Sequence, residues 1–143
     1  MPKIERTVTV DKPLEAVWTY LTDFTNTEDW DPPTVSTTRT SGDGGVGTVY
    51  RNVSSLLGHE VEIEYTVLEV EPHSVFRLEG TASSMKMLDT MRFSESPEGV
   101  TVTYTAEFDP QGGAKLAEPL MPLGLKKIGD GAQEQMQEAL ERL

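Results

Sequence analysis

The sequence predicts an α+β fold: a curved antiparallel sheet of about seven strands wrapped around a long C-terminal helix, with two short helices after the first strand. Two observations predict it. Successive short segments alternate between apolar and polar residues, which is typical of strands with one solvated face. The last segment instead has an apolar stripe at three- and four-residue steps, which indicates a helix that covers the other face. With 143 residues the chain can bury one core, and we expect a single domain over residues 1–143.

The N-terminal part is predicted to be a strand followed by two helical segments. Residues 3–10 alternate between polar and apolar side chains, which indicates the strand. Asp11 followed by Pro13 is a helix-start signal, because the carboxylate can accept a first-turn N–H and proline needs no acceptor there. We expect this helix to end near Phe24 and a second short segment to run through Trp30. The apolar stripe of the first helix consists of Leu14, Val17, Trp18 and Leu21.

The middle of the chain is predicted to be strands. In the second of them, Val49 and Val53 define an apolar face, which puts Arg51 on the same face and Tyr50 on the opposite, outward one. In the third, the alternation slips after Val67, which indicates a bulge or the end of the strand. The six predicted segments are 35–40, which is expected to be an edge strand, 47–54, 60–67, 75–82, 85–93 and 100–108.

The final helix is predicted from its apolar stripe. Pro119 and Pro122 should kink or restart the helix before that stripe begins. Gly124, Gly129 and Gly131 lie within the helical stretch, where each costs about 1 kcal/mol relative to alanine. They leave space for a ligand, permit close packing on the sheet, or mark a kink. The stripe consists of Leu125, Ile128, Ala132, Met136, Ala139 and Leu143.

Composition excludes several classes of function. Twelve Lys and Arg residues against 24 Asp and Glu residues give a net charge of −12, which repels phosphate backbones, so we expect no nucleic-acid partner. No apolar run approaches the roughly 18 residues of a membrane span, so we expect no integral membrane association. Cysteine is absent and the two histidines have no metal-ligand spacing, so we expect no metal and no cofactor. The N-terminal residues lack an apolar signal region, and we expect a cytoplasmic protein.

The order of elements resembles the SRPBCC, or START-like, superfamily and its helix-grip fold. The segments that carry the resemblance are VDKPLEAVWTYLTDF at 10–24, WDPP at 30–33, GVGTVYR at 45–51 and FDPQGGAKLAEPLMP at 108–122. Three of them, 10–24, 45–51 and 108–122, look like the small bacterial polyketide cyclase/dehydrase-like members. The resemblance implies a cavity between the sheet and the C-terminal helix that binds hydrophobic or amphipathic small molecules.

Two charged residues are the first candidates for chemistry in such a cavity. Arg51 would hold a ligand carboxylate, enolate or phenolate if its face is the concave one; otherwise it is an edge arginine paired structurally. Asp89 lies in phase with three methionines, where loss of hydration would raise its pKa as a general acid or base requires. The alternative is a bulge at Leu88 that turns Asp89 outward. Arg51 and Asp89 are therefore the candidate catalytic residues.

The remaining candidates are expected to bind ligand rather than to react with it. Tyr65 and Tyr104 carry hydroxyl groups on apolar faces, and Trp30 resembles the cavity-mouth aromatic of the superfamily. Methionines suit an adaptable lining, although filling the core is an equal alternative. With Arg51 and Asp89, the predicted ligand-binding set is Trp30, Tyr65, Met87, Met91, Tyr104, Met121, Leu125 and Ile128.

Three functions remain open from the sequence. The first is a protein that binds a hydrophobic or amphipathic small molecule in the cavity. The second is a cyclase or dehydratase that uses the same cavity on a poly-carbonyl or aromatic substrate. The third is a toxin-like or chaperone-cofactor interaction protein. A cavity well below roughly 300 Å³ would favour the third, because ligand pockets begin near that volume.

Overall fold

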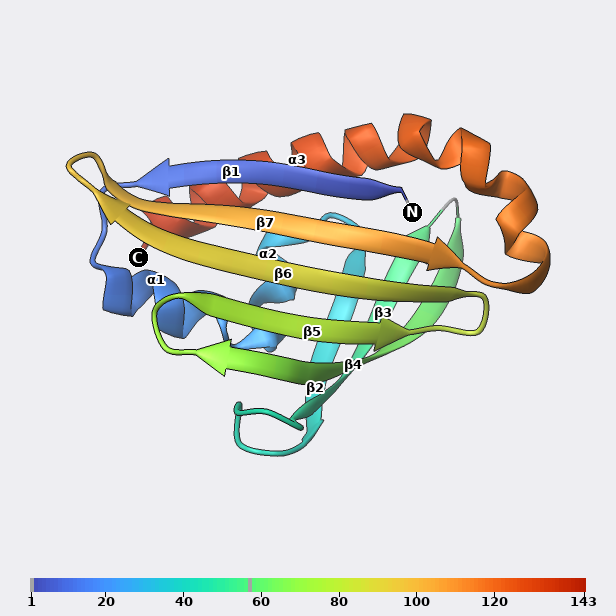
Figure 1. Cartoon of the computed structure of the whole chain (residues 1–143), viewed down its shortest axis with the longest axis horizontal. Helices are drawn as coiled ribbons and strands as arrows, with labels where there is room; N and C mark the ends of the chain where they lie inside the picture. The colour runs from blue at the N-terminus through green and yellow to red at the C-terminus, as the bar shows by residue number, and fades with distance from the viewer. Residues whose placement is uncertain (1, 57) are drawn as a thin grey trace.

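The computed structural model describes residues 2–56 and 58–143, which form one antiparallel seven-stranded sheet. The strand order is β1-β7-β6-β5-β4-β3-β2, so β1 and β2 are the two edges. Figure 1 shows the sheet curving from β1 round to β2. The strands are β1 (Lys3–Val10), β2 (Thr34–Ser41), β3 (Val49–Leu56), β4 (His59–Glu71), β5 (Val75–Thr81), β6 (Met85–Ser96) and β7 (Gly99–Pro110).

The helices lie on the inner side of the curve, and the long C-terminal helix packs against β1 and α2. This is the helix-grip arrangement that the resemblance implies, and the predicted fold class is confirmed. The helix α3 begins directly after η2, with Pro122 in its first turn, where a missing N–H removes no hydrogen bond. The helical elements are α1 (Leu14–Leu21), η1 (Phe24–Asn26), α2 (Thr27–Trp30), η2 (Gly112–Leu120) and α3 (Met121–Glu141).

The start of α1 differs from the prediction. Its N-cap residue is Pro13, in an extended conformation, and no side chain caps the helix. Asp11 therefore lies two residues before the cap, too far back to accept a first-turn N–H. The predicted slip in β4 is confirmed, because the pairing of β4 with β5 shifts register between Val67 and Glu69.

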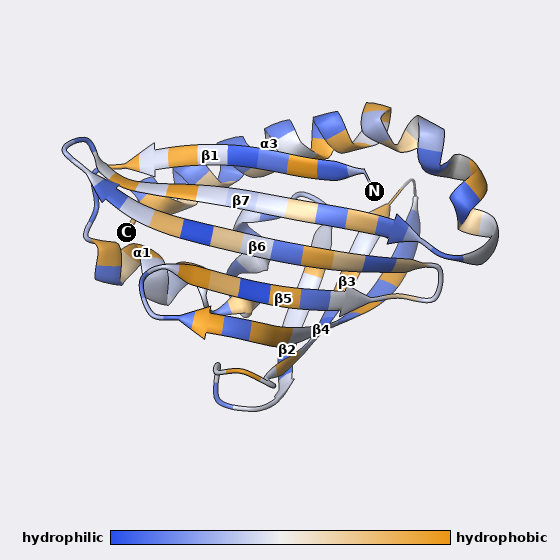
Figure 2. Ribbon diagram, viewed as in Figure 1, coloured by the Kyte–Doolittle hydropathy of each residue, from blue (hydrophilic) through white to orange (hydrophobic). Residues whose placement is uncertain are grey.

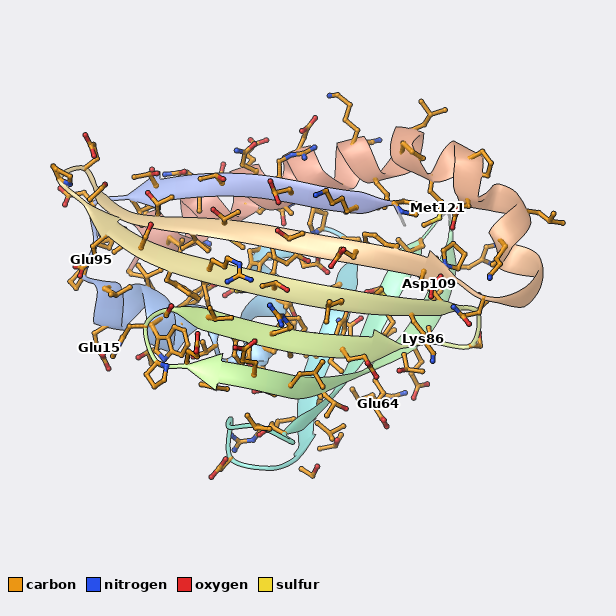
Figure 3. All side chains as sticks on the ribbon, in the orientation of Figure 1. Glu15, Glu64, Lys86, Glu95, Asp109 and Met121 are labelled. Carbon is orange, nitrogen blue, oxygen red and sulfur yellow. The ribbon has the colours of Figure 1, made fainter. Side chains whose placement is uncertain are left out.

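Alternation along the strands separates an inner, apolar face from an outer, charged one. Figure 2 shows apolar and polar residues alternating along β5 and β6. On β6, Met87, Asp89 and Met91 are all buried, so no bulge turns Asp89 outward. The outer face carries charged side chains such as Glu64 and Lys86, which are exposed and labelled in Figure 3. One face therefore builds the interior and the other meets solvent.

The strand β3 has the opposite phase to the one predicted. Tyr50, Asn52 and Ser54 are buried, whereas Arg51 is exposed. Register fixes this assignment, because paired residues of an antiparallel sheet share a face and Tyr50 pairs with Tyr65. The prediction that Tyr50 faces outward is wrong, because the inner face of β3 is largely polar and the apolar residues Val49 and Val53 lie on the outer face.

The glycines of α3 permit close packing. A Cβ atom at Gly129 would lie 2.9 Å from Ile4 Cγ2 and from Arg6 Cζ, and one at Gly131 would lie 3.0 Å from Pro32 Cγ. These two glycines let α3 approach β1 and the end of α2, and Gly129 is buried. A Cβ atom at Gly124 would meet nothing within 4 Å. Of the three predicted roles, close packing holds for Gly129 and Gly131.

We expect Gly129→Leu and Gly124→Ala to change stability in opposite directions. Leucine at 129 must displace β1 or α3, which we expect to lower the free energy of unfolding by about 1–3 kcal/mol. Alanine at 124 adds helix propensity in open space and should raise it by up to about 1 kcal/mol. Urea unfolding of both variants measures the two changes. An unchanged midpoint for Gly129→Leu would contradict the packing role.

Candidate functional site

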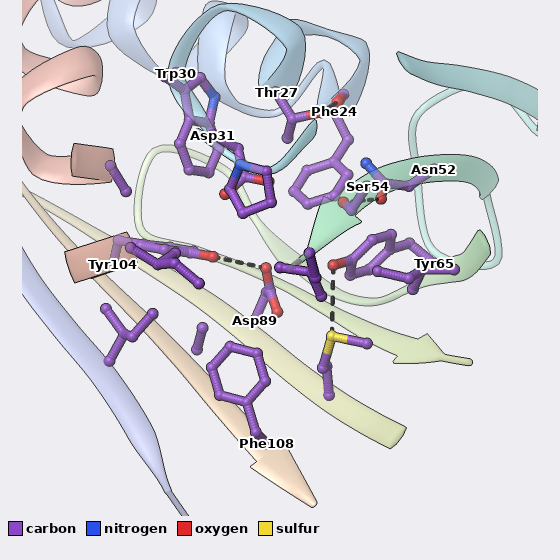
Figure 4. Close-up of a pocket in the computed structure, with 18 residues that line it drawn as sticks. Phe24, Thr27, Trp30, Asp31, Asn52, Ser54, Tyr65, Asp89, Tyr104 and Phe108 are labelled. Carbon is purple, nitrogen blue, oxygen red and sulfur yellow. Dashed lines mark hydrogen bonds between the residues drawn. The ribbon is translucent and has the colours of Figure 1, made fainter. Parts of the chain in front are cut away.

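A pocket lies between the inner face of the sheet, the segment around α2, and α3. Eighteen residues line it, contributed by β1, β3, β4, β6 and β7 of the sheet, by η1, α2 and the residues that follow, and by α3 (Figure 4). Its walls are mainly apolar, and its volume is about 60 Å³. That is room for a few water molecules, well below the roughly 300 Å³ at which ligand pockets begin.

Asp89 and Tyr104 form the polar centre of the pocket. Asp89 lies on β6 and Tyr104 on the neighbouring strand β7, and both side chains point into the interior. The Tyr104 hydroxyl donates a hydrogen bond to Asp89 Oδ2 at 2.9 Å. Burial raises the pKa of Asp89 from 3.8 to about 7; the bond from Tyr104 opposes the shift and the nearby Asp31 adds to it. Near neutral pH the carboxyl group therefore exchanges between its protonated and ionised forms.

Asp31 supplies a second carboxyl group to the same pocket. It follows the last residue of α2, and its Oδ2 accepts a hydrogen bond from Thr34 Oγ1 at 2.6 Å. Loss of hydration raises the pKa of Asp31 from 3.8 to about 6, against the lowering effect of Thr34. Because Asp31 also raises the pKa of Asp89, the two groups resist being ionised together.

Two aromatic pairs frame the carboxyl groups. The rings of Trp30 and Tyr104 meet edge to face at 5.2 Å, and those of Phe24 and Tyr65 at 4.9 Å. The Tyr65 hydroxyl donates to Met87 Sδ at 3.8 Å, a weak bond. Figure 4 shows the hydroxyl groups of Tyr65 and Tyr104 on either side of Asp89. Burial and then the charge of Asp89 raise the pKa of both tyrosines, so both stay protonated.

A buried polar network closes one end of the pocket and explains the inverted phase of β3. Asn52 Nδ2 donates to Thr34 Oγ1 at 3.0 Å and to Thr37 Oγ1 at 2.8 Å. Ser54 Oγ donates to Asn52 Oδ1 at 2.7 Å, and Thr27 bonds to Thr37 through their hydroxyl groups at 2.6 Å. These bonds tie α2 to β2 and β3, so polar residues occupy the inner face there.

The structure brings six of the predicted ligand-binding residues together and leaves four outside. Met91 is fully buried and Leu125 nearly so, and both belong to the core rather than to the pocket wall. Met121 is half-buried at the start of α3 and also lies outside the lining. The fourth is Arg51. The six that line the pocket are Trp30, Tyr65, Met87, Asp89, Tyr104 and Ile128.

The placement of Arg51 in the cavity is wrong. Arg51 lies on the outer face of β3, where its Nε donates to Glu62 Oε1 at 2.7 Å. Both side chains are more than half exposed, so this is a surface ion pair. The prediction assumed that Val49 and Val53 lie on the inner face of β3. In the structure the inner face carries the polar residues Asn52 and Ser54 instead.

Asp31 and Asn52 are the main lining residues that sequence reasoning missed. Asp31 was inside the segment WDPP, and a carboxylate between a tryptophan and two prolines is the signal that could have singled it out. Asn52 has no comparable signal, because an alternating strand with polar residues on both faces does not show which face is buried. Phe24 and Phe108 also line the pocket.

The described part of the chain contains neither a metal-binding cluster nor a membrane-crossing helix. No three or more His, Asp or Glu side chains there are placed so that they could hold a metal ion. None of its helices combines the length and the apolar character that a membrane crossing requires.

Comparison with known proteins gives a family match and several similar folds. A family model described as "Polyketide cyclase / dehydrase and lipid transport" matches residues 1–143. Protein CV1439 from Chromobacterium violaceum is similar with a TM-score of 0.76 and 17% identity, covering 99% of both chains. The ZhuI aromatase/cyclase from Streptomyces sp. R1128 is similar with a TM-score of 0.68 and 20% identity, covering 99% of this chain and 89% of the other.

A START superfamily protein from Mycobacterium smegmatis is similar with a TM-score of 0.72 and 10% identity, covering 96% of this chain and 98% of the other. A comparison with curated protein sequences finds no match. At these identities the solved structures share the fold with this chain.

Proposed function

Since the chain belongs to the polyketide cyclase/dehydrase and lipid transport family, we propose that it binds a hydrophobic or amphipathic small molecule in the pocket between the sheet and α3. Asp89 and its hydrogen-bond partner Tyr104 anchor the polar end of that molecule, and the aromatic and aliphatic walls hold the rest. The proposal treats residues 1–143 as one domain acting in the cytoplasm.

The observation that carries the proposal is the buried carboxyl group of Asp89. The side chain is only 4% exposed, yet among the described residues only Tyr104 donates a hydrogen bond to it. Burying such a group is unfavourable unless a partner compensates for its lost hydration. An apolar residue of similar size would stabilise the fold more, so the presence of an acid at this buried position supports a role in binding.

The small volume means that the pocket has to widen for a ligand. The segment formed by η2 and the first turn of α3 is suited to move, because Leu116 is 88% exposed and Leu123 is 79% exposed. Neither of these two side chains is held by the core, although Met121 in the first turn of α3 packs against it and would lose that contact on displacement. Outward displacement of the start of α3 would carry Ile128 away from the pocket wall.

Native mass spectrometry of the protein isolated from its own cells tests the proposal. We expect a small molecule to co-purify with the native chain and equally with Arg51→Gln, a control on the outer face. Ala106→Phe should remove it, because Ala106 is 2% exposed and lines the pocket beside Asp89. Circular dichroism establishes that the variants fold.

Bare protein in every preparation, together with no binding of added apolar molecules, would contradict the proposal. Such a result would favour an interaction protein, which the pocket volume of about 60 Å³ also suits. The acidic interior is the reason for ranking the binding function above it.

One observation favours catalysis as a second candidate. A pKa near 7 makes Asp89 suited to give and take protons at neutral pH, as a cyclase or dehydratase requires. The test separates turnover from binding. Asp89→Asn should still bind a poly-carbonyl ligand but should no longer cyclise or dehydrate it. The mass and absorbance of the product measure the turnover. Equal turnover by the variant would assign Asp89 to binding alone.

A further inference from the structure

The pocket contains two carboxyl groups and no compensating cation. Asp31 and Asp89 both line it, and none of the described lining residues is lysine, arginine or histidine. Ion pairs of the described chain lie elsewhere: Arg51 bonds to Glu62 on the outer face and Arg6 to Asp130 on α3. In most proteins a buried acid has a basic partner or a set of N–H donors. Here neither is supplied by the described residues.

The free polar atoms of the pocket are hydrogen-bond acceptors. Asp89 receives one bond, at Oδ2, and Asp31 receives one side-chain bond, also at Oδ2. Among the described residues nothing donates to the second oxygen of either carboxyl group. The Tyr65 hydroxyl donates its proton to Met87 Sδ, and no described group donates to its oxygen, so its lone pairs are open as well. When both carboxyl groups are ionised, a ligand that matches this set must be a donor.

Aromatic rings surround these acceptors. Trp30 and Tyr104 meet edge to face on one side, and Phe24 and Tyr65 on the other (Figure 4). Ring faces attract a cation, and they also accommodate an apolar or aromatic body attached to it. The net charge of −12 further favours the approach of a cation over that of an anion.

We propose that the pocket selects an amine in its ammonium form, with the –NH₃⁺ group between Asp31, Asp89 and the Tyr65 hydroxyl and an apolar body against the rings. The three N–H donors of an ammonium can serve the open oxygens of Asp31 and Asp89 and the Tyr65 hydroxyl, and its charge offsets the repulsion between two carboxylates. This inference rests on the proposed function, since it names the chemical class of ligand for the same pocket.

Three matched probes test the charge preference: phenethylamine, 2-phenylethanol and phenylacetate, titrated into the full chain and followed by ¹H–¹⁵N NMR. They share a ring and a short arm and differ in the charge of the polar end. We expect phenethylamine to bind roughly tenfold to a hundredfold more tightly than the alcohol, and phenylacetate to bind most weakly. The shifted amides should include those of Asp89 and Tyr104.

Variants and pH identify the groups responsible. Asp89→Asn and Asp31→Asn should each remove most of the preference for the amine, whereas Glu79→Gln, the same charge change on the exposed side of β5, should leave it unchanged.

The titratable groups facing the site are Asp31, Asp89, Tyr65 and Tyr104, and the tyrosines stay neutral. Amine affinity should therefore rise between pH 5 and pH 8 as the carboxyl groups ionise, because the ammonium keeps its proton over that range.

Two results would overturn the inference, and they differ. If the alcohol or phenylacetate binds as tightly as the amine, or if the preference survives in both Asn variants, the ammonium proposal fails while the pocket remains a binding site. If none of the three probes perturbs residues of the pocket, the ammonium proposal fails; the proposed function fails with it only if the isolated protein is also bare and other added apolar molecules do not bind. Near-ultraviolet circular dichroism of each variant excludes unfolding as the cause of a lost preference.

Discussion

Replacing Asp89 by asparagine is expected to stabilise the protein, and to do so more strongly as the pH rises. The native pKa of about 7 lies above the value of 3.8 of a hydrated aspartate, so the folded protein resists ionisation of this group. Ionising this buried carboxyl group lowers the free energy of unfolding. This loss of stability is absent below about pH 4, grows between pH 4 and pH 7, and is complete above pH 7. Asparagine has the same shape, can still accept the hydrogen bond from Tyr104, and carries no such cost.

The free energy of unfolding of Asp89→Asn should exceed that of the parent protein by an amount that increases by roughly 2 to 3 kcal/mol between pH 5 and pH 8. This figure follows from the linkage between protonation and folding, with a pKa of 3.8 in the unfolded chain and about 7 in the folded protein. Urea unfolding at pH 5, 6, 7 and 8 measures it. Glu79→Gln is the control, since Glu79 is exposed on β5 and should change stability by less than about 0.5 kcal/mol at every pH. A gain for Asp89→Asn that does not depend on pH would mean that Asp89 titrates as an ordinary surface acid.

Truncating Trp30 to alanine is expected to be the most damaging single change in the pocket. Trp30 is 1% exposed, ends α2, and meets the ring of Tyr104 edge to face at 5.2 Å. Its removal leaves a cavity between α2, α3 and the sheet, and we expect a loss of about 3–5 kcal/mol in the free energy of unfolding. Thermal and urea unfolding measure the loss.

Trp18→Ala is the matched comparison for Trp30→Ala. Trp18 is half-buried and packs on Phe93 and Phe76, outside the pocket. Its truncation should cost less, because part of the ring already meets water. Trp30→Ala should also weaken retention of a bound molecule when it is tested below its unfolding temperature, whereas Trp18→Ala should not. Equal losses of stability for the two variants would show that α2 is not fixed by Trp30.

The two acids of the pocket, Asp89 buried and Asp31 half-buried, explain why the same residue affects stability and function in opposite directions. Asp31 and Asp89 are unfavourable for folding because each loses hydration, and they provide the open acceptors on which the proposed binding depends. A protein that replaced both would be more stable and would lose its polar anchor. This opposition is common at binding and catalytic sites.

Much of the fold could be predicted from residue periodicity. On β6 and β7, apolar residues alternate with polar ones over long runs, so the inner face was identified correctly and Asp89 and Tyr104 were placed in the interior. The predicted segments 3–10 and 85–93 match strands that begin at the same residues. The stripe on the last helix likewise identified the side that packs on the sheet, because helix burial follows a fixed angular spacing. Its last predicted member is wrong, since Leu143 lies beyond the end of α3 and is exposed.

The strand β3 could not be predicted in the same way. Its inner residues Tyr50, Asn52 and Ser54 are held by contacts with η1, β2 and β4, and its outer valines are only half-buried. Where both faces of a strand carry polar and apolar residues, periodicity does not indicate which face is dry. Arg51 was placed in the cavity for that reason, and Asp31, which lies in a loop without periodicity, was overlooked.

The amino-acid sequence by itself determined the order of elements, the curved sheet, its covering helix and the phase that Asp89 shares with the methionines of its strand, because hydrophobic spacing along each element is a local property. Only the tertiary structure decided which residues share the pocket with Asp89. Asp31 and Asp89 are 58 positions apart in the chain and become coupled when α2 closes over the sheet. Both the loss of hydration that raises their pKa values and the lack of a described basic partner arise from that closure, which no single segment specifies.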